Sequence, residues 1–248
     1  MGRVFHRRVM WNTTIRKMTR LSFLCLSCLY ALNVQAARPF VTDDARLTTA
    51  GSCQLESWSR LYAHSTEWWA LPACNPTGNF EITAGGGRAH GHGQGWTTDQ
   101  VLQFKGLARD LTPHGWGWGL AVGTVRHPEI APGPNMLGNT YAYVPMSASM
   151  NHDRWILHAN VGWLRDKASR QDRITWGLGA EVPASSRLLL IAESFGDSRN
   201  KPYVQAGLRY AILPNLLQAD TTLGQQVAGP SSARWLSFGV RYTPDRLF

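Results

Sequence analysis

The feature that most constrains the fold is an alternation of apolar with small or polar residues, repeated along the chain between Cys53 and Tyr242. In the stretch RITWGLGAEV, every second residue from Ile174 to Val182 is apolar, and the residues between them are Thr, Gly and Glu. A period of two places the two sets on opposite faces of an extended chain, which is typical of a β-strand and not of a helix. The sequence therefore predicts an all-β protein.

The alternation predicts about twelve antiparallel strands. Their expected ranges are 53–63, 67–73, 79–88, 97–109, 115–126, 140–150, 154–165, 173–182, 187–195, 202–212, 216–225 and 234–243. Most of them reach the roughly 9–11 residues that a tilted strand needs to cross a bilayer. The range 67–73 is short, and ten strands remain if it and its hairpin partner are not strands.

The connections between these strands alternate in length. Those after the even-numbered strands are brief and rich in turn-forming residues, namely CNPTGN, DLTPHG, NHD, PASS and LPN. Those after the odd-numbered strands, from the third onward, are mostly longer: AHGHGQGW, HPEIAPGPNMLGN, DKASRQD, GDSRNK and QVAGPSSA. Outer-membrane barrels combine short periplasmic turns with longer external loops. We therefore expect an antiparallel up-and-down transmembrane β-barrel over residues 53–243, with a soluble barrel as the less favoured alternative.

The two faces of the expected strands fit a barrel in a membrane. Apolar rows would contact lipid, and aromatic residues near strand ends would form the girdles of the two membrane interfaces. The girdle candidates are Trp155, Trp163, Trp176, Tyr210 and Tyr242. The candidates to line the lumen are Glu56, Glu81, Lys105, His158, Asn160, Glu181, Glu193, Gln205, Arg209, Asp220 and Arg241. Leu189 and Ile191 break the alternation, because they share a face with Glu193.

Residues 1–36 have the pattern of a cleaved export signal. A basic start is followed by an apolar run at 21–32, which is too short to span a membrane, and by the small-residue site Val34-Gln35-Ala36. A membrane anchor is the alternative reading, and Met18 is a second candidate start besides Met1. The signal holds six of the 25 basic residues and none of the 16 acidic ones, so its removal lowers the net charge from +9 to +3. Nucleic-acid binding is therefore not expected.

Two of the four cysteines, Cys25 and Cys28, would leave with the signal. Cys53 and Cys74 remain, at the start of the first expected strand and the end of the second. In an oxidising compartment such a pair predicts a disulfide. Two cysteines are too few for a zinc site, and the HGHGQG loop with His90 and His92 lacks a third fixed ligand. We expect neither a metal nor a cofactor.

Two terminal segments flank the expected barrel. Residues 37–52 would either hang in the periplasm or enter the lumen as a plug, with acidic residues facing Arg209 and Arg241. Residues 244–248 would form a tail that ends on Phe248, a terminal aromatic of the kind that the barrel-assembly machinery reads.

Residues 37–58 and 69–81 carry a family resemblance, in the words RPFVTDD, QLE and ALPACNP. The chain resembles exported proteobacterial proteins that are similar to the outer-membrane channel family named for a phenol-degradation (MetA) pathway. The shared words cover about a quarter of the chain after the signal. The resemblance implies an outer-membrane β-barrel and uptake of small organic molecules, and it brings no catalytic residues.

One cluster suggests catalysis. Ser149, His152 and Asp153 lie close together, as in an outer-membrane lipid hydrolase. The expected topology places them at a short periplasmic turn, the wrong end for external lipid, so the sequence does not predict an enzyme.

Taken together, these patterns predict a narrow channel for passive passage of small solutes through the outer membrane of a Gram-negative bacterium. The expected partners are outer-membrane lipid and lipopolysaccharide, the barrel-assembly machinery and a small solute. The alternatives are a closed structural or loop-binding barrel, a lipid hydrolase and a soluble periplasmic ligand-binding barrel. The state of the lumen distinguishes the first two hypotheses: a channel needs an open lumen, whereas a closed barrel has a plugged one.

Overall fold

The computed structural model of the protein describes residues 40–91, 93, 95–126 and 137–248. The chain divides into two compact units, Met1–Asn33 and Val34–Phe248, and the described residues all belong to the second. The predicted export signal at 1–36 and residues 127–136 of the longest predicted loop lie outside the described residues.

Most of the described residues lie in strands. They are β1 (Ser52–Tyr62), β2 (Ser65–Asn75), β3 (Phe80–Gly91), β4 (Trp96–Arg109), β5 (Trp116–Arg126), β6 (Thr140–Met150), β7 (Trp155–Asp166), β8 (Gln171–Pro183), β9 (Leu188–Asp197), β10 (Tyr203–Leu213), β11 (Leu217–Gln226) and β12 (Trp235–Tyr242), with a single 3-10 turn η1 (Ser231–Ala233) before β12. Within the described residues, none of the helical structure has the length and hydropathy of a membrane span.

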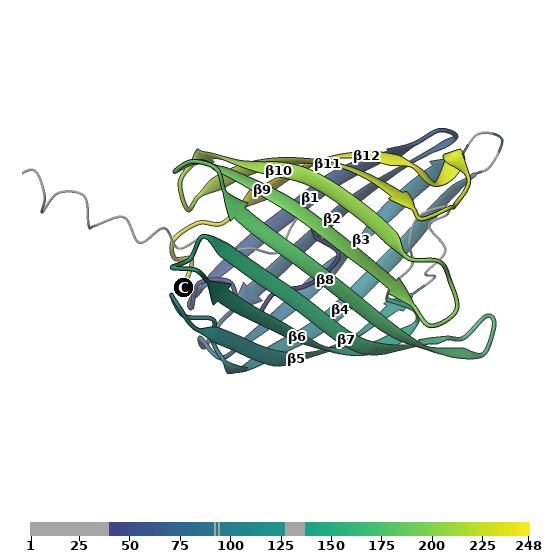
Figure 1. Ribbon diagram of the computed structural model, residues 1–248. Coiled ribbons are helices and arrows are strands. Elements are labelled where there is room, and N and C mark those ends of the chain that lie inside the picture. Colours follow the sequence, from purple (N-terminus) through teal and green to yellow (C-terminus); the bar gives the residue numbers. More distant parts are fainter. Residues whose placement is uncertain (1–39, 92, 94, 127–136) are drawn as a thin grey trace, which may run out of the picture. The chain divides into compact units, whose positions relative to one another are not determined.

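The strands form one closed barrel (Figure 1). Each strand pairs antiparallel with its neighbour in the sequence, and β1 pairs with β12 to close the ring. The predicted up-and-down topology and the twelve strands are confirmed, including the doubtful second strand, which is longer than the predicted 67–73. No strand end differs from its predicted position by more than three residues.

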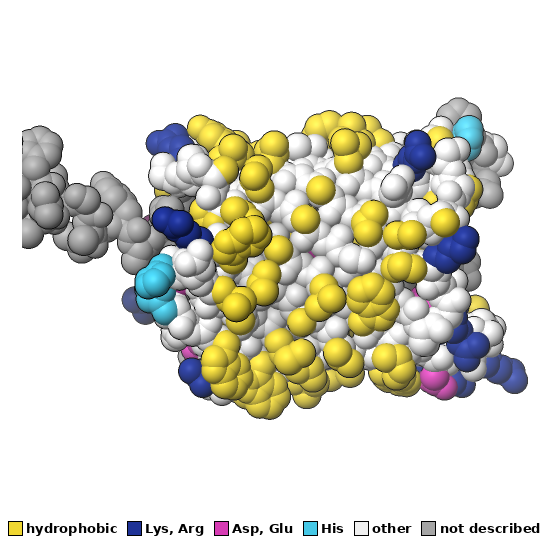
Figure 2. All heavy atoms as spheres, viewed as in Figure 1, with side chains coloured by type: hydrophobic (Ala, Val, Ile, Leu, Met, Phe, Trp, Pro, Cys, Tyr) yellow, Lys and Arg dark blue, Asp and Glu magenta, His cyan; other side chains and the backbone are white. Residues whose placement is uncertain are grey.

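The period-two pattern becomes an outer and an inner surface. Along β12, for example, buried residues alternate with more exposed ones. On the face in view in Figure 2, hydrophobic side chains cover the wall, and charged side chains gather at its two ends. Several outward-facing side chains are widely exposed, among them Leu178 at 59% and Leu223 at 67%. An apolar outer wall of this kind matches the solvent properties of a lipid bilayer.

The barrel has two distinct rims. The C-terminus, the start of β1 and the turns after even-numbered strands lie at one end, here called the short-turn rim (Figure 1). The connections after odd-numbered strands lie at the other end, the long-loop rim. An arginine stacks on a tryptophan at each rim, Arg88 on Trp96 at the long-loop rim (4.6 Å) and Arg109 on Trp116 at the short-turn rim (4.2 Å).

The predicted girdle residues all lie on the outer face. Trp155 begins β7 and Tyr242 ends β12, and Tyr210 lies toward the same short-turn rim on β10. Trp163 lies toward the long-loop rim of β7. Trp176 is the exception, because it lies near the middle of β8, away from the strand ends that a girdle requires.

The first hairpin carries the predicted disulfide. Cys53 and Cys74 face each other across β1 and β2 and are bonded, so this prediction is confirmed. The C-terminal tail folds back beside them. The N–H groups of Leu247 and Phe248 both donate to the carbonyl oxygen of Gly51, at 2.9 and 3.1 Å. The Phe248 side chain itself is 56% exposed.

Candidate functional site: the barrel lumen

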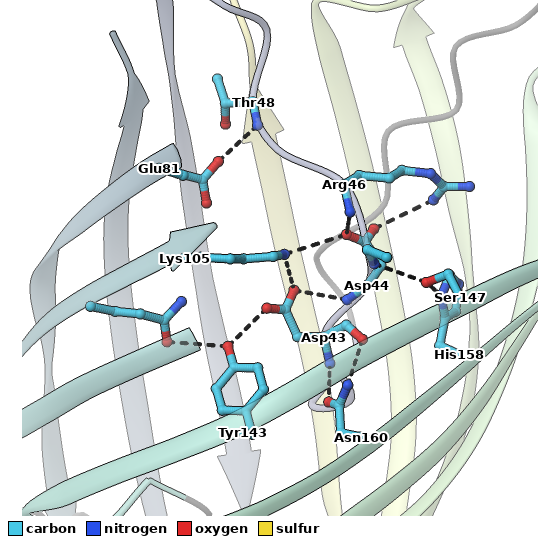
Figure 3. Close-up of polar contacts among 12 residues, drawn as sticks. Asp43, Asp44, Arg46, Thr48, Glu81, Lys105, Tyr143, Ser147, His158 and Asn160 are labelled. Atoms are coloured by element: carbon cyan, nitrogen blue, oxygen red, sulfur yellow. Dashed lines mark hydrogen bonds and ion pairs between the residues drawn. The ribbon is translucent and has the colours of Figure 1, made fainter. Parts of the chain in front are cut away.

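A short stretch of chain before β1 lies inside the barrel. Residues 40–49, here called the lumen segment, contact the inner wall from β9, at Val41, to β3, at Thr48. Figure 3 shows the contacts of this segment from Asp43 to Thr48. In a closed ring of twelve strands β3 and β9 are six positions apart, so they face each other across the lumen. The lumen segment therefore runs from one side of the barrel to the opposite side.

Wall carboxylates accept hydrogen bonds from the backbone of the lumen segment. The two carboxylate oxygens of Glu193 accept the N–H groups of Val41 and Thr42, each at 2.8 Å. Glu81 accepts the N–H of Thr48 at 2.8 Å. Bonds from a neutral donor to a carboxylate are stronger than bonds between neutral groups. Both ends of the lumen segment are thus held by their main chain.

Neutral side chains hold the middle of the lumen segment in the same way. Asp43 donates its N–H to the Asn160 amide oxygen (2.6 Å), and the Asn160 amide nitrogen donates to the Asp43 carbonyl oxygen (2.9 Å). The N–H of Ala45 donates to Ser147 Oγ at 2.9 Å. Five backbone N–H groups of ten residues find side-chain acceptors on the wall. The wall therefore binds the main chain of the segment.

One lysine of the wall binds the two acidic residues of the lumen segment. Lys105 Nζ lies 2.7 Å from Asp43 Oδ1 and 3.6 Å from Asp44 Oδ1. Tyr143 also donates to Asp43, at 2.8 Å. The sequence suggested Arg209 and Arg241 as the partners of these acids, whereas the ion pair in the structure is made by Lys105. Strand periodicity predicts that a residue faces the lumen. It does not predict which of the lumen-facing basic residues lies next to a segment that is not itself a strand.

A second charged group surrounds Glu181. Arg46 of the lumen segment and Arg209 of β10 each place a guanidinium nitrogen 3.5 Å from a Glu181 carboxylate oxygen. His158 Nε2 lies 3.7 Å from the same carboxylate, and His158 Nδ1 is hydrogen-bonded to Ser147 Oγ at 2.8 Å. The Glu181 side chain is completely buried, so it needs these cations to offset its lost hydration.

The residue types of a hydrolase site meet in Ser147, His158 and Glu181, but a substrate cannot reach them. Ser147 is 3% exposed and lies beneath the lumen segment, whose Ala45 N–H already donates to its hydroxyl. A nucleophile needs room for a substrate carbonyl beside it. The group therefore acts here as an attachment point for the lumen segment.

The apolar exception in the sequence pattern also finds its reason in the lumen segment. Phe40 packs with Leu189 and Ile191 in a buried cluster inside the barrel. These are the two residues that share a face with Glu193 and that an aqueous lumen would not favour. They form an apolar seat for the first described residue of the lumen segment.

Two glycines of β8 leave room for the same stretch. A Cβ atom on Gly177 would lie 2.4 Å from Thr42 Oγ1, and one on Gly179 would lie 3.0 Å from Phe40 Cε1. A Cβ on Gly177 would therefore force the Thr42 side chain to shift, and one on Gly179 would require the Phe40 ring to move slightly.

The remaining wall, formed by β10–β12 and β1, presents charges of both signs. Glu56, Arg209, Asp220 and Arg241 point inward and are between 3% and 8% exposed, and Arg241 Nε lies 4.0 Å from Glu56 Oε1. Gln205 hydrogen-bonds Glu193 beside them. All eleven predicted lumen residues thus have inward-facing side chains, and only Asn160 is more than slightly exposed. The lumen is polar, mixed in charge and closely packed.

Aromatic residues on the inner face were not singled out from the sequence. Tyr62, Phe195 and Trp235 form a buried cluster toward the long-loop rim, and Tyr141 belongs to a second one with Val101, Val125 and Leu164. Tyr62 has the same parity as Arg60 and Glu56, and Phe195 the same parity as Glu193. That parity was the signal that could have identified them as lumen residues.

The cluster predicted as the alternative catalytic site lies at the short-turn rim. Ser149 donates directly to Asp153, and the backbone N–H of His114 donates to Asp153 at 2.9 Å. Partial burial tends to raise the pKa of Asp153. The two hydrogen bonds and the nearby histidines outweigh this effect and lower that pKa below its usual value. Since the serine binds the carboxylate rather than a histidine base, the cluster joins two neighbouring turns and lacks an activated nucleophile.

The histidine-rich loop does not assemble a metal site in the described residues. His90 packs its ring 5.1 Å from the Trp96 ring, and His92 lies outside the part of the chain that the structure describes. Within that part, no group of three or more His, Cys, Asp or Glu side chains could hold a metal ion.

A closed twelve-stranded barrel with an apolar outer wall and a charged lumen is the architecture of a porin-like protein. The family model described as "Uncharacterised conserved protein UCP029691" matches residues 25–243, so the chain belongs to that family. No curated protein sequence matches the chain.

Solved porins share the fold. The KdgM porin in complex with disordered oligogalacturonate is similar with a TM-score of 0.58 and 8% identity, over 77% of this chain and 99% of that chain. The NanC porin is similar with a TM-score of 0.51 and 11% identity, over 77% of this chain and 98% of that chain. At such identities the likeness concerns the fold alone.

Proposed function

We propose that the protein spans the outer membrane of a Gram-negative bacterium and is a narrow channel for small solutes. The observation that carries the proposal is the closed barrel, apolar outside and lined with charged and polar side chains inside. Charged groups on an inner wall are stable where water, a polar solute or a charged partner reaches them, and so many of them suit a polar lumen better than an apolar core. Passage would be passive, down a concentration gradient, with no catalytic step.

Small organic molecules are the solute class that we propose. The resemblance of residues 37–58 and 69–81 to the phenol-degradation channel family supports this class. Oligogalacturonate belongs to the KdgM complex and is not carried over to this chain.

A closed structural or loop-binding barrel is the competing function, and the lumen segment is the observation that favours it. The segment crosses the lumen, and the charged side chains around it are almost fully buried. If the lumen never opens, the exposed connections at the long-loop rim would be the functional surface.

Planar-bilayer recording on the purified, folded protein tests the proposal. We expect small, discrete conductance steps, partly blocked by millimolar phenol or benzoate on the long-loop side. Protein unfolded by heat before addition is the control and should give no steps. Absence of steps at every salt concentration, for protein whose barrel is shown intact by circular dichroism, would favour the closed barrel. Recovery of the protein in the soluble periplasmic fraction would overturn both the channel and the closed membrane barrel.

A further inference from the structure

We propose that the lumen segment, residues 40–49, is a gate that holds the channel in a low-conductance state and opens it when it leaves the wall of β3–β9. The inference rests on the proposed channel function and names its regulation. It starts from the position of the segment, which joins opposite sides of the lumen at β9 and β3.

The first element of the gate is an ionic latch. Lys105 of β4 binds Asp43 and Asp44 at once, and its side chain is 3% exposed. Asp43 is 16% exposed and Arg46 is 14% exposed, so water reaches the segment's side of the charged contacts. A partly hydrated ion pair can exchange its partner for water and ions, unlike one sealed in an apolar core.

The second element is a set of acceptors that recognises main chain. Glu193, Glu81, Asn160 and Ser147 accept five backbone N–H groups of the lumen segment. When the segment leaves, these four side chains would face a water-filled lumen, where polar groups are readily hydrated. The released state therefore leaves no buried polar group without a partner, a condition that an opening motion has to meet.

The third element is the space that β8 provides. Gly177 and Gly179 give the segment a path close against the wall, because a Cβ on either would crowd Thr42 or Phe40. Phe40 is the one large apolar anchor, on Leu189 and Ile191. The other contacts are polar, namely the ion pairs of Lys105 and Arg46 and the hydrogen bonds to the wall, and water can replace them when the segment moves.

The test compares single-channel conductance of latch variants in planar bilayers. Lys105→Met removes the latch with little change in volume, and we expect larger conductance steps and a higher open fraction than in the unmodified protein. Lys105→Arg keeps the charge and should stay near the unmodified level. Lys201→Met is the matched control. Lys201 lies outside the lumen, in the connection between β9 and β10, and donates to the carbonyl oxygen of Ala228 in the connection after β11.

A disulfide lock separates movement of the segment from a change in wall charge. A Cβ on Gly177 would lie 3.2 Å from Thr42 Cβ, close to the Cβ–Cβ spacing of a disulfide (about 3.5–4.5 Å), and Thr42→Cys removes the hydroxyl that lies nearest to it. Thr42→Cys with Gly177→Cys would therefore tie the segment to β8. Added to Lys105→Met, the lock should return the conductance to the low level, and a reductant should release it. The single-cysteine variants with the reductant control for reduction of the native disulfide.

The outcomes distinguish this proposal from the channel proposal. If the unmodified protein conducts and neither Lys105→Met nor deletion of residues 40–47 raises the conductance, the gate is refuted and the channel stands. If the oxidised lock leaves Lys105→Met at high conductance, the effect comes from wall charge and the gate is again refuted. If no variant conducts, including the deletion, the channel function itself fails.

Discussion

At the scale of single residues, the lumen shows how a barrel accommodates charge that is removed from water. A buried carboxylate without partners would cost several kcal/mol. Glu193 avoids this cost through two backbone N–H groups and Gln205, and Glu181 through Arg46, Arg209 and His158. In both groups at least one donor comes from the lumen segment. The charge of the wall and the position of the segment are therefore interdependent.

This interdependence predicts the effect of Glu193→Gln. The amide keeps one acceptor oxygen but turns an NH2 group toward a backbone N–H, so one hydrogen bond is lost at a cost of about 1–3 kcal/mol. We expect faster amide hydrogen exchange in residues 40–49, measured by mass spectrometry on the folded protein. Glu67→Gln is the matched control, because Glu67 pairs with Arg60 instead of the segment. Equal protection in Glu193→Gln and the unmodified protein would contradict the role assigned to Glu193.

At the scale of elements, strands and the lumen segment differ in how far the sequence predicts them. The strands follow from local alternation, which is why all twelve were found. Glu181, for example, lies buried on the inner face of β8. The lumen segment has no periodic pattern of its own. Its path is set by contacts with residues more than 100 positions away, such as Glu193 and Asn160. The sequence therefore left its location open between periplasm and lumen.

The β1–β2 hairpin makes an element-level prediction about its disulfide. Cys53 and Cys74 are 21 residues apart, and a crosslink that closes a loop of this length removes enough unfolded-state entropy to stabilise a fold by about 3 kcal/mol. We expect Cys53→Ser with Cys74→Ser to lower the free energy of unfolding by about that amount, measured by guanidinium titration in detergent or vesicles. The unmodified protein with a reductant should show the same loss. A free energy unchanged in both cases would mean that barrel closure, through β1 and β12, already restrains the hairpin.

At the scale of the whole molecule, two surfaces with opposite requirements lie on the same strands. Successive residues such as Leu178 and Gly179 face lipid and lumen in turn, so every strand serves both. The sequence predicted this division well, because it depends only on parity. What parity could not predict is how full the lumen is, since Phe40 is far from Leu189 and Ile191 in the sequence and contacts them only in the folded barrel. The outer wall, by contrast, can be tested one position at a time.

An outer wall in contact with hydrocarbon predicts a dependence on depth for an introduced charge. Leu178 lies near the middle of β8 and is 59% exposed, whereas Ile174 lies on the same face about 13 Å nearer the long-loop rim and is 55% exposed. Leu178→Arg should lower the free energy of unfolding from lipid vesicles by about 2–4 kcal/mol, and Ile174→Arg by about 0–1 kcal/mol, because an arginine near the rim extends its charge into water. Guanidinium titration of both variants in vesicles measures the difference. Equal effects at the two positions would mean that water, and not lipid, surrounds the barrel, and the soluble-barrel alternative would then have to be taken up again.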